Sequence, residues 1–130
     1  MKTLHFETVV LSKTITVELL PAGLDWNVLI SGGDAPHVGS VSVARPDSGG
    51  GVCLEKLVLP THKDDYVGDR YATALAALTG RTVAVSCGIH YDGLSKSGIS
   101  QVMEAMEGLL PQVCAALDGQ MPETDDFTKR

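Results

Sequence analysis

The segment at residues 81–97, RTVAVSCGIHYDGLSKS, decides the fold of this chain because it predicts a buried strand, a polar turn and the start of a helix. Larger apolar residues at positions 83, 85, 87 and 89 alternate with small residues at 82, 84, 86 and 88. Since successive side chains of a strand point to opposite faces, this pattern predicts a central strand covered on both faces. His90 and Asp92 follow at a spacing of two and are expected to point the same way at the end of the strand. Gly93 can supply a turn, and Ser95 or Ser97 can cap the helix that follows.

Alternating apolar and polar residues upstream of this segment predict five more strands. The first two are expected to form a β-hairpin within residues 3–20, because the pattern resumes after Ser12 and Lys13. The other three are expected at residues 26–30, 38–43 and 52–59, separated by glycine- and proline-containing turns. So many strands before any helix predict an α+β fold with a mainly antiparallel sheet of about six strands and two helices, rather than a βαβ fold.

Two amphipathic helices complete the prediction. Thr61 is expected to cap the first helix, with Asp64 three residues later, and Gly80 is expected to end it. The second helix is expected from residue 98 to residue 117, with Pro111 kinking or splitting it. Residues 118–130 lack periodicity and are predicted to be a mobile tail, so residues 1–117 form the single predicted domain.

Composition excludes several classes of function. A chain of 130 residues is expected to form one domain, and its net charge of −6 and pI of about 5.0 argue against a nucleic-acid-binding protein. The apolar stretches are too short for a membrane span, and residues 1–10 do not resemble a signal peptide, so we expect a cytoplasmic protein without a membrane partner. Three widely spaced cysteines without a C-x-x-C pair indicate reduced thiols rather than disulfides or zinc ligands.

Residues that could bind a ligand occur in three segments of the sequence. The first is the glycine-rich loop at residues 32–39, GGDAPHVG, whose backbone N–H groups can approach an anion, although Gly-Gly-Asp is also ordinary turn chemistry. The second is THKDD at residues 61–65, at a predicted helix start that favours a phosphate or carboxylate. In the alternative interpretation, the acidic residues of this segment bind no ligand and only complement the helix dipole. The third is GIHYDG at residues 88–93, in which the histidine could bind a ligand, hold a metal, do acid–base work, or simply be satisfied by a neighbouring carboxylate.

Taken together, GGDAPHVGSV, THKDD and TVAVSCGIHYDGLSKSGI resemble the LpdD-like prenylated-flavin chaperones, which are associated with UbiD-type aromatic-acid decarboxylases such as gallate decarboxylase. The order and spacing of the three motifs fit that family over roughly residues 3–115. Thr61 departs from the pattern, because a glycine is expected before the histidine of the second motif. The residues that correspond to the family's polar positions, together with the glycines of the first motif, are Gly32, Gly33, Asp34, His37, His62, Lys63, Asp64, His90 and Asp92.

The resemblance implies a dimeric protein that is similar in fold to the proteasome assembly chaperones of the Pba3/Pba4 type. It also implies a non-catalytic role, in which the chain binds reduced prenylated FMN and helps to deliver it to an apo UbiD-type decarboxylase. A flavin prenyltransferase is then a further expected partner. The residues are compatible with this role, since a flavin phosphate needs N–H donors or a cation, and the flavin ring needs an apolar slot with a few polar contacts.

Two other functions stay open from the sequence. The chain could be a protein-assembly chaperone or an accessory subunit of the decarboxylase that binds no flavin, with its histidines and aspartates serving the fold. It could also be a small metal-dependent enzyme with His62, His90 and Asp92 as ligands, although this spacing fits no hydrolase motif.

Overall fold

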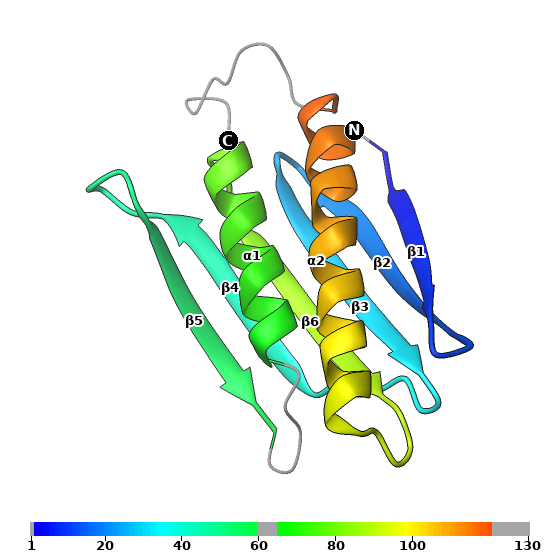
Figure 1. The fold of residues 1–130 in the computed structure, drawn as a ribbon. Coiled ribbons are helices and arrows are strands. Elements are labelled where there is room, and N and C mark those ends of the chain that lie inside the picture. Colours follow the sequence, from blue (N-terminus) through cyan, green and yellow to red (C-terminus); the bar gives the residue numbers. More distant parts are fainter. Residues whose placement is uncertain (1, 60–64, 121–130) are drawn as a thin grey trace.

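The computed structural model describes residues 2–59 and 65–120, which form a six-stranded sheet with two helices packed on one of its faces (Figure 1). The elements, in chain order, are β1 (Leu4–Val10), β2 (Lys13–Ala22), β3 (Asp25–Gly33), β4 (Ser40–Pro46), β5 (Val52–Val58), α1 (Asp65–Thr79), β6 (Val83–His90) and α2 (Lys96–Asp118).

The spatial order of the strands differs from their order in the chain. It is β1-β2-β3-β6-β4-β5, and each pair of neighbours is antiparallel except β3 and β6, which are parallel. The predicted α+β fold with a mainly antiparallel sheet is therefore confirmed. The last strand of the chain lies in the middle of the sheet, so the connection from β3 to β4 has to cross β6.

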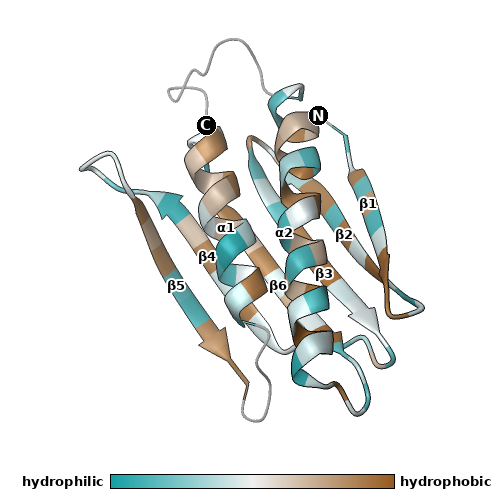
Figure 2. Ribbon diagram, viewed as in Figure 1, coloured by the Kyte–Doolittle hydropathy of each residue, from teal (hydrophilic) through white to brown (hydrophobic). Residues whose placement is uncertain are grey.

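The core lies between the sheet and the two helices. Alternate residues of the strands point toward the helices and are buried, and both helices present an apolar side to them, while Figure 2 shows hydrophilic bands on the remaining sides of α2. The largest fully buried side chains are those of Trp26, Tyr71, Ile15, Leu19, Ile30, Leu75, Met106 and Leu117. Leu78 of α1, which helical spacing from Tyr71, Ala74 and Leu75 assigns to the buried side, is instead 41% exposed.

The hairpin at the start of the chain has an unusual turn. Leu11 and Ser12 connect β1 and β2, and both have positive φ angles, of 52° and 68°. A two-residue loop with this backbone geometry matches the twist of the strands, but it favours asparagine and glycine over residues with larger side chains. The predicted hairpin is confirmed, and it contains a locally unfavourable backbone conformation.

Several predicted boundaries change in the structure. The strand expected at residues 26–30 continues to Gly33, because pairing with β2 and β6 on both sides extends it. The next strand begins at Ser40, not at residue 38. Gly80, with a φ of 66°, follows the end of α1 as predicted. The predicted start at Thr61 lies outside the described residues.

Helix α2 runs through Pro111 without interruption, so this residue does not split the helix, and the alternative that it kinks the helix stays a prediction. Proline removes one N–H donor from a helix, at a cost of about 3 kcal/mol. Leu109, Leu110 and Val113 around it are buried, and such packing of an apolar side provides most of the stability of a helix in a protein. Ser95 caps the helix as predicted, because its hydroxyl accepts a hydrogen bond from the N–H of Gly98 at 3.1 Å.

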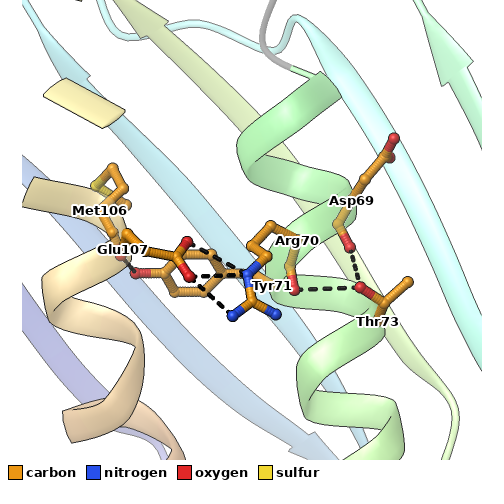
Figure 3. Close-up of polar contacts among 6 residues, drawn as sticks. All are labelled: Asp69, Arg70, Tyr71, Thr73, Met106 and Glu107. Atoms are coloured by element: carbon orange, nitrogen blue, oxygen red, sulfur yellow. Dashed lines mark hydrogen bonds and ion pairs between the residues drawn. The ribbon is translucent and has the colours of Figure 1, made fainter. Parts of the chain in front are cut away.

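Two side-chain contacts join the helices to each other (Figure 3). The guanidinium of Arg70 donates to the carboxylate of Glu107 from both Nε and Nη2, and the Nη2 contact is 2.8 Å. This hydrogen bonding lowers the pKa of Glu107 and raises that of Arg70. Beneath the pair, the buried Tyr71 hydroxyl donates to the carbonyl of Met106 at 2.7 Å, and burial strongly raises the pKa of the phenol. The two contacts link α1 directly to α2.

Candidate functional site

The connection from β3 to β4 builds the candidate site. Its residues, Asp34 to Gly39, are called the crossing segment here because they pass over β6 from the β3 side to the β4 side. The N–H of Asp34 donates to the carbonyl of His90 at 2.6 Å, and the N–H of Gly39 donates to the carbonyl of Cys87 at 2.9 Å. Backbone hydrogen bonds therefore hold both ends of the segment against the C-terminal end of β6.

Gly88 determines on which face of the sheet the crossing takes place. A Cβ atom added at Gly88 would coincide with the carbonyl group of His37, so the crossing segment occupies the space of the absent side chain. The neighbouring Cys87 points to the other face, where its Cβ lies against Gly68 of α1. Because successive strand residues point to opposite faces, the crossing segment lies on the face that the helices leave uncovered.

His90 and Asp92 form the polar centre of the site. The Nε2 atom of His90 lies 2.9 Å from Oδ1 of Asp92, as their spacing predicted, and both side chains are exposed. The backbone N–H of Asp92 donates to Oδ2 of Asp34 at 3.0 Å, and Nζ of Lys13 lies 3.6 Å from Oδ1 of the same carboxylate. Asp34 thus ties the turn after β6 to the crossing segment and to the start of β2.

His37 brings a second imidazole to the same place. Its ring centroid lies 6.4 Å from that of His90, with an interplanar angle of 77°. Its Nδ1 atom lies 3.0 Å from the carbonyl oxygen of Ala35, which orients the ring within the crossing segment. Two imidazoles and two carboxylates therefore lie within one small area, where they can offer both hydrogen-bond donors and acceptors to a ligand.

Tyr91 supports the site from the protein interior, and the sequence analysis did not assign it a role. Its side chain is buried, and its hydroxyl donates to the carbonyl of Val10 at 2.8 Å. Burial, followed by the nearby charge of Asp34, raises the pKa of the phenol. The sequence did contain a signal for this role. Tyr91 lies between His90 and Asp92, and when two neighbours of an extended residue point outward, that residue points inward.

Comparison with known proteins assigns the chain to a family. Residues 11–118 match the family described as "Prenylated flavin chaperone LpdD-like domain". The chain belongs to the LpdD-like prenylated flavin chaperone family. Within that family, the protein LpdD of Lactiplantibacillus plantarum is 23% identical over 100 residues, which cover 73% of this chain and 71% of the relative. The family supports a chaperone role for this LpdD-like chain.

The fold is also similar to that of a solved chaperone. One chain of the crystal structure of a chaperone complex for yeast 20S proteasome assembly aligns with a TM-score of 0.57 and 15% identity. The alignment covers 87% of the LpdD-like chain and 96% of the yeast chain. The predicted similarity in fold to proteasome assembly chaperones is therefore confirmed. Within the described ranges, neither helix is long and apolar enough to cross a membrane.

The structure brings together only some of the residues that the motifs of the LpdD-like chain predicted for the site. Asp34, His37, His90 and Asp92 lie in one cluster. Gly32 and Gly33 border it but belong to β3, not to a loop, because they pair with β2 or β6. A Cβ at Gly32 would lie 2.5 Å from the Cα of Ile15, so glycine allows β2 to approach closely. His62, Lys63 and Asp64 lie outside the described residues. Their binding roles, and those of the two glycines, stay predictions.

A second polar cluster surrounds the described start of α1. Nζ of Lys56 donates to Oδ2 of Asp65 at 3.0 Å and to Oδ2 of Asp69 at 2.8 Å, while the Ser42 hydroxyl donates to Oδ1 of Asp69 at 2.7 Å. The hydrogen bond from Lys56 lowers the pKa of Asp65. These contacts join β4 and β5 to α1, so a structural role explains the acidic residues here. Across residues 2–59 and 65–120, no three His, Cys, Asp or Glu side chains are grouped as a metal site.

Proposed function

We propose that this chain is a non-catalytic cytoplasmic chaperone that binds reduced prenylated FMN and delivers it to an apo UbiD-type aromatic-acid decarboxylase. The observation that carries the proposal is the cluster of two imidazoles and two carboxylates, built by motifs that lie within the family-matched residues. A homodimer is the proposed form of the chaperone, and a flavin prenyltransferase is the proposed source of the cargo.

The chemistry of the cluster fits the cargo. A flavin offers a planar ring system whose polar edge needs a few well-placed hydrogen bonds. Reduction changes the N–H pattern of that ring, and a carboxylate accepts hydrogen bonds without offering any when ionised. The exposed carboxylate of Asp92, held by His90, is such an acceptor, and the half-exposed ammonium of Lys13 is a cation beside Asp34. Exposed groups also suit a carrier, because its cargo has to leave again.

The test is an anaerobic titration of the purified protein with reduced prenylated FMN, followed by absorbance and native mass spectrometry. Oxidised prenylated FMN and ordinary FMN serve as ligand controls. We expect saturable binding that is selective for the reduced prenylated species, followed by transfer to an apo-decarboxylase. If none of the three flavins binds while the chain still co-purifies with the decarboxylase, the flavin-carrier proposal is rejected and a protein-assembly role replaces it.

A matched pair of variants locates the binding site. His90→Ala removes one hydrogen-bonding group from the cluster and is expected to weaken binding roughly 5- to 30-fold, as the loss of about 1–2 kcal/mol implies. His5→Ala is the control, because the side chain of His5 is 50% exposed and that of His90 is 49% exposed. His5 lies beside Glu7 in β1, at 3.3 Å, and is not part of the cluster. Equal affinity of the two variants would place the site elsewhere.

A further inference from the structure

The backbone of the crossing segment is already engaged in hydrogen bonds within the protein. Four of its N–H groups donate to carbonyls of β6 at 2.6–3.4 Å, and they belong to Asp34, Ala35, His37 and Gly39. Pro36 has no N–H group to offer. An anion is held by backbone N–H groups only when these groups point at it and have no other acceptor. A phosphate beside this segment therefore needs a cation from a side chain.

Lys13 brings a cation to this position. It is the first residue of β2, and the hydroxyl of Tyr91 holds the turn before it against the site. That hydroxyl donates to the carbonyl of Val10 at 2.8 Å and lies 3.5 Å from the carbonyl oxygen of Lys13. The Nζ atom of Lys13 lies 3.6 Å from Oδ1 of Asp34. The first hairpin and the crossing segment thus meet at this ammonium group.

The pair of Lys13 and Asp34 leaves the ammonium group able to bind a second anion. Their separation of 3.6 Å is longer than the hydrogen-bond range of about 2.7–3.2 Å, and the Lys13 side chain is 51% exposed. The Asp34 side chain is only 27% exposed, and its other oxygen accepts the N–H of Asp92. Since an ammonium group has three N–H donors, Asp34 can hold it in place without occupying all of them.

Other cations of the chain serve the fold or lie away from the cluster. Nζ of Lys56 donates to two carboxylates of α1, and the guanidinium of Arg70 donates twice to a carboxylate of α2. Arg45 lies near the end of β4, whereas the crossing segment leads into the start of that strand. Across residues 2–59 and 65–120, Lys13 is the lysine or arginine that forms an ion pair with a member of the cluster.

The charges of the cluster define an orientation for a bound flavin. The two oxygens of Asp34 separate its neighbours, because Oδ2 faces the backbone of Asp92 and Oδ1 faces Lys13. The Asp92 carboxylate is 80% exposed and repels a phosphate, whereas the Lys13 ammonium attracts it. The polar ring edge would then face His90 and Asp92, and the phosphate would face the start of β2. The ribityl chain between ring and phosphate allows both contacts to form together.

We propose that Lys13 binds the phosphate group of the flavin cargo, and that Asp34 is a positioning residue for the Lys13 ammonium. This assignment rests on the proposed flavin-carrier function and adds a binding residue to it. Its failure is distinguishable, because a chain that binds prenylated flavins without regard to their phosphate remains a flavin carrier. The test therefore compares two ligands that differ only in the phosphate.

The two ligands are reduced prenylated FMN and reduced prenylated riboflavin, which a phosphatase produces from the former under anaerobic conditions. We expect the wild type to bind the phosphorylated ligand about 10-fold more tightly, as a charge-assisted hydrogen bond implies. Lys13→Met removes the charge and keeps the length of the side chain, so it is expected to bind both ligands equally. Lys13→Arg keeps the charge and is expected to restore the preference.

Arg45→Met is the matched control, because the Arg45 side chain is 53% exposed and also lies beside one carboxylate, at 3.9 Å. It is expected to keep the full preference for the phosphorylated ligand, and circular dichroism checks that every variant is folded. A Lys13→Met variant that keeps the preference, or that binds both ligands equally weakly compared with the wild type, would overturn the assignment. Loss of the preference in Lys63→Met alone would give the phosphate to that lysine instead. A wild type that binds both ligands with the same affinity rejects the role of Lys13, and one that binds neither rejects the carrier function itself.

Discussion

Replacement of Gly88 by alanine tests how the candidate site is built. The added methyl group would coincide with the carbonyl of His37, which is a backbone group and cannot rotate away. The crossing segment would have to shift, and it would lose hydrogen bonds such as the one from the N–H of His37 to the carbonyl of Gly88, at 3.4 Å. Overpacking costs about 1–3 kcal/mol and each lost hydrogen bond about 1 kcal/mol, so we expect a loss of about 3 kcal/mol in the free energy of unfolding.

Urea unfolding, followed by the fluorescence of the single tryptophan, measures this change. The slope of the unfolding free energy against urea concentration is expected to stay constant, so the change appears as a shift of the midpoint. Gly108→Ala is the control, because Gly108 lies within α2 and an added Cβ would meet nothing within 4 Å. This control is expected to gain about 0.5–1 kcal/mol, since alanine is the better helix former. If Gly88→Ala stays within about 1 kcal/mol of the wild type, the crossing segment is not held as described.

Two further predictions concern the hairpin and the core. Replacing Leu11 by asparagine and Ser12 by glycine is expected to raise the free energy of unfolding by about 1 kcal/mol, because both positions have positive φ angles; unchanged thermal stability would contradict this. Burial raises the pKa of Tyr71, so its contribution to stability is complete below about pH 10 and is lost as the pH rises toward the folded pKa. Tyr71→Phe should cost about 1–2 kcal/mol at pH 7 and flatten the decline above pH 10, as urea unfolding at pH 7, 9, 10 and 11 can show; an equally steep decline would assign the effect to another group.

The sequence predicted the elements of this fold well because their signals are local. Alternation identified the strands, and the helical period identified α1 and α2. The bond between His90 and Asp92 and the capping hydroxyl of Ser95 were also predictable, since each depends on residues two or three positions apart. The predicted split at Pro111 was wrong because a local rule disfavours proline inside a helix, whereas burial of the neighbouring residues stabilises the helix.

The candidate site was only partly predictable. Its histidines and aspartates were visible as motifs, but nothing in the sequence indicated that Asp34 would hold the backbone of Asp92 or that Lys13 would lie beside it. Both contacts join positions far apart in the chain. Gly88 was expected only to allow close packing, and its particular role, making room for the crossing segment, depends on the position of His37 in space.

The sequence by itself thus determined which segments become strands and helices, and which polar residues stand at their ends, because hydrophobic period and capping act over a few residues. Only the tertiary structure decided that the last strand lies between β3 and β4, since strand order depends on which apolar surfaces are buried together. That insertion forces the chain to cross β6 and brings His37 to His90. Both helices pack on one face of the sheet, and this leaves the other face open beside the site (Figure 1).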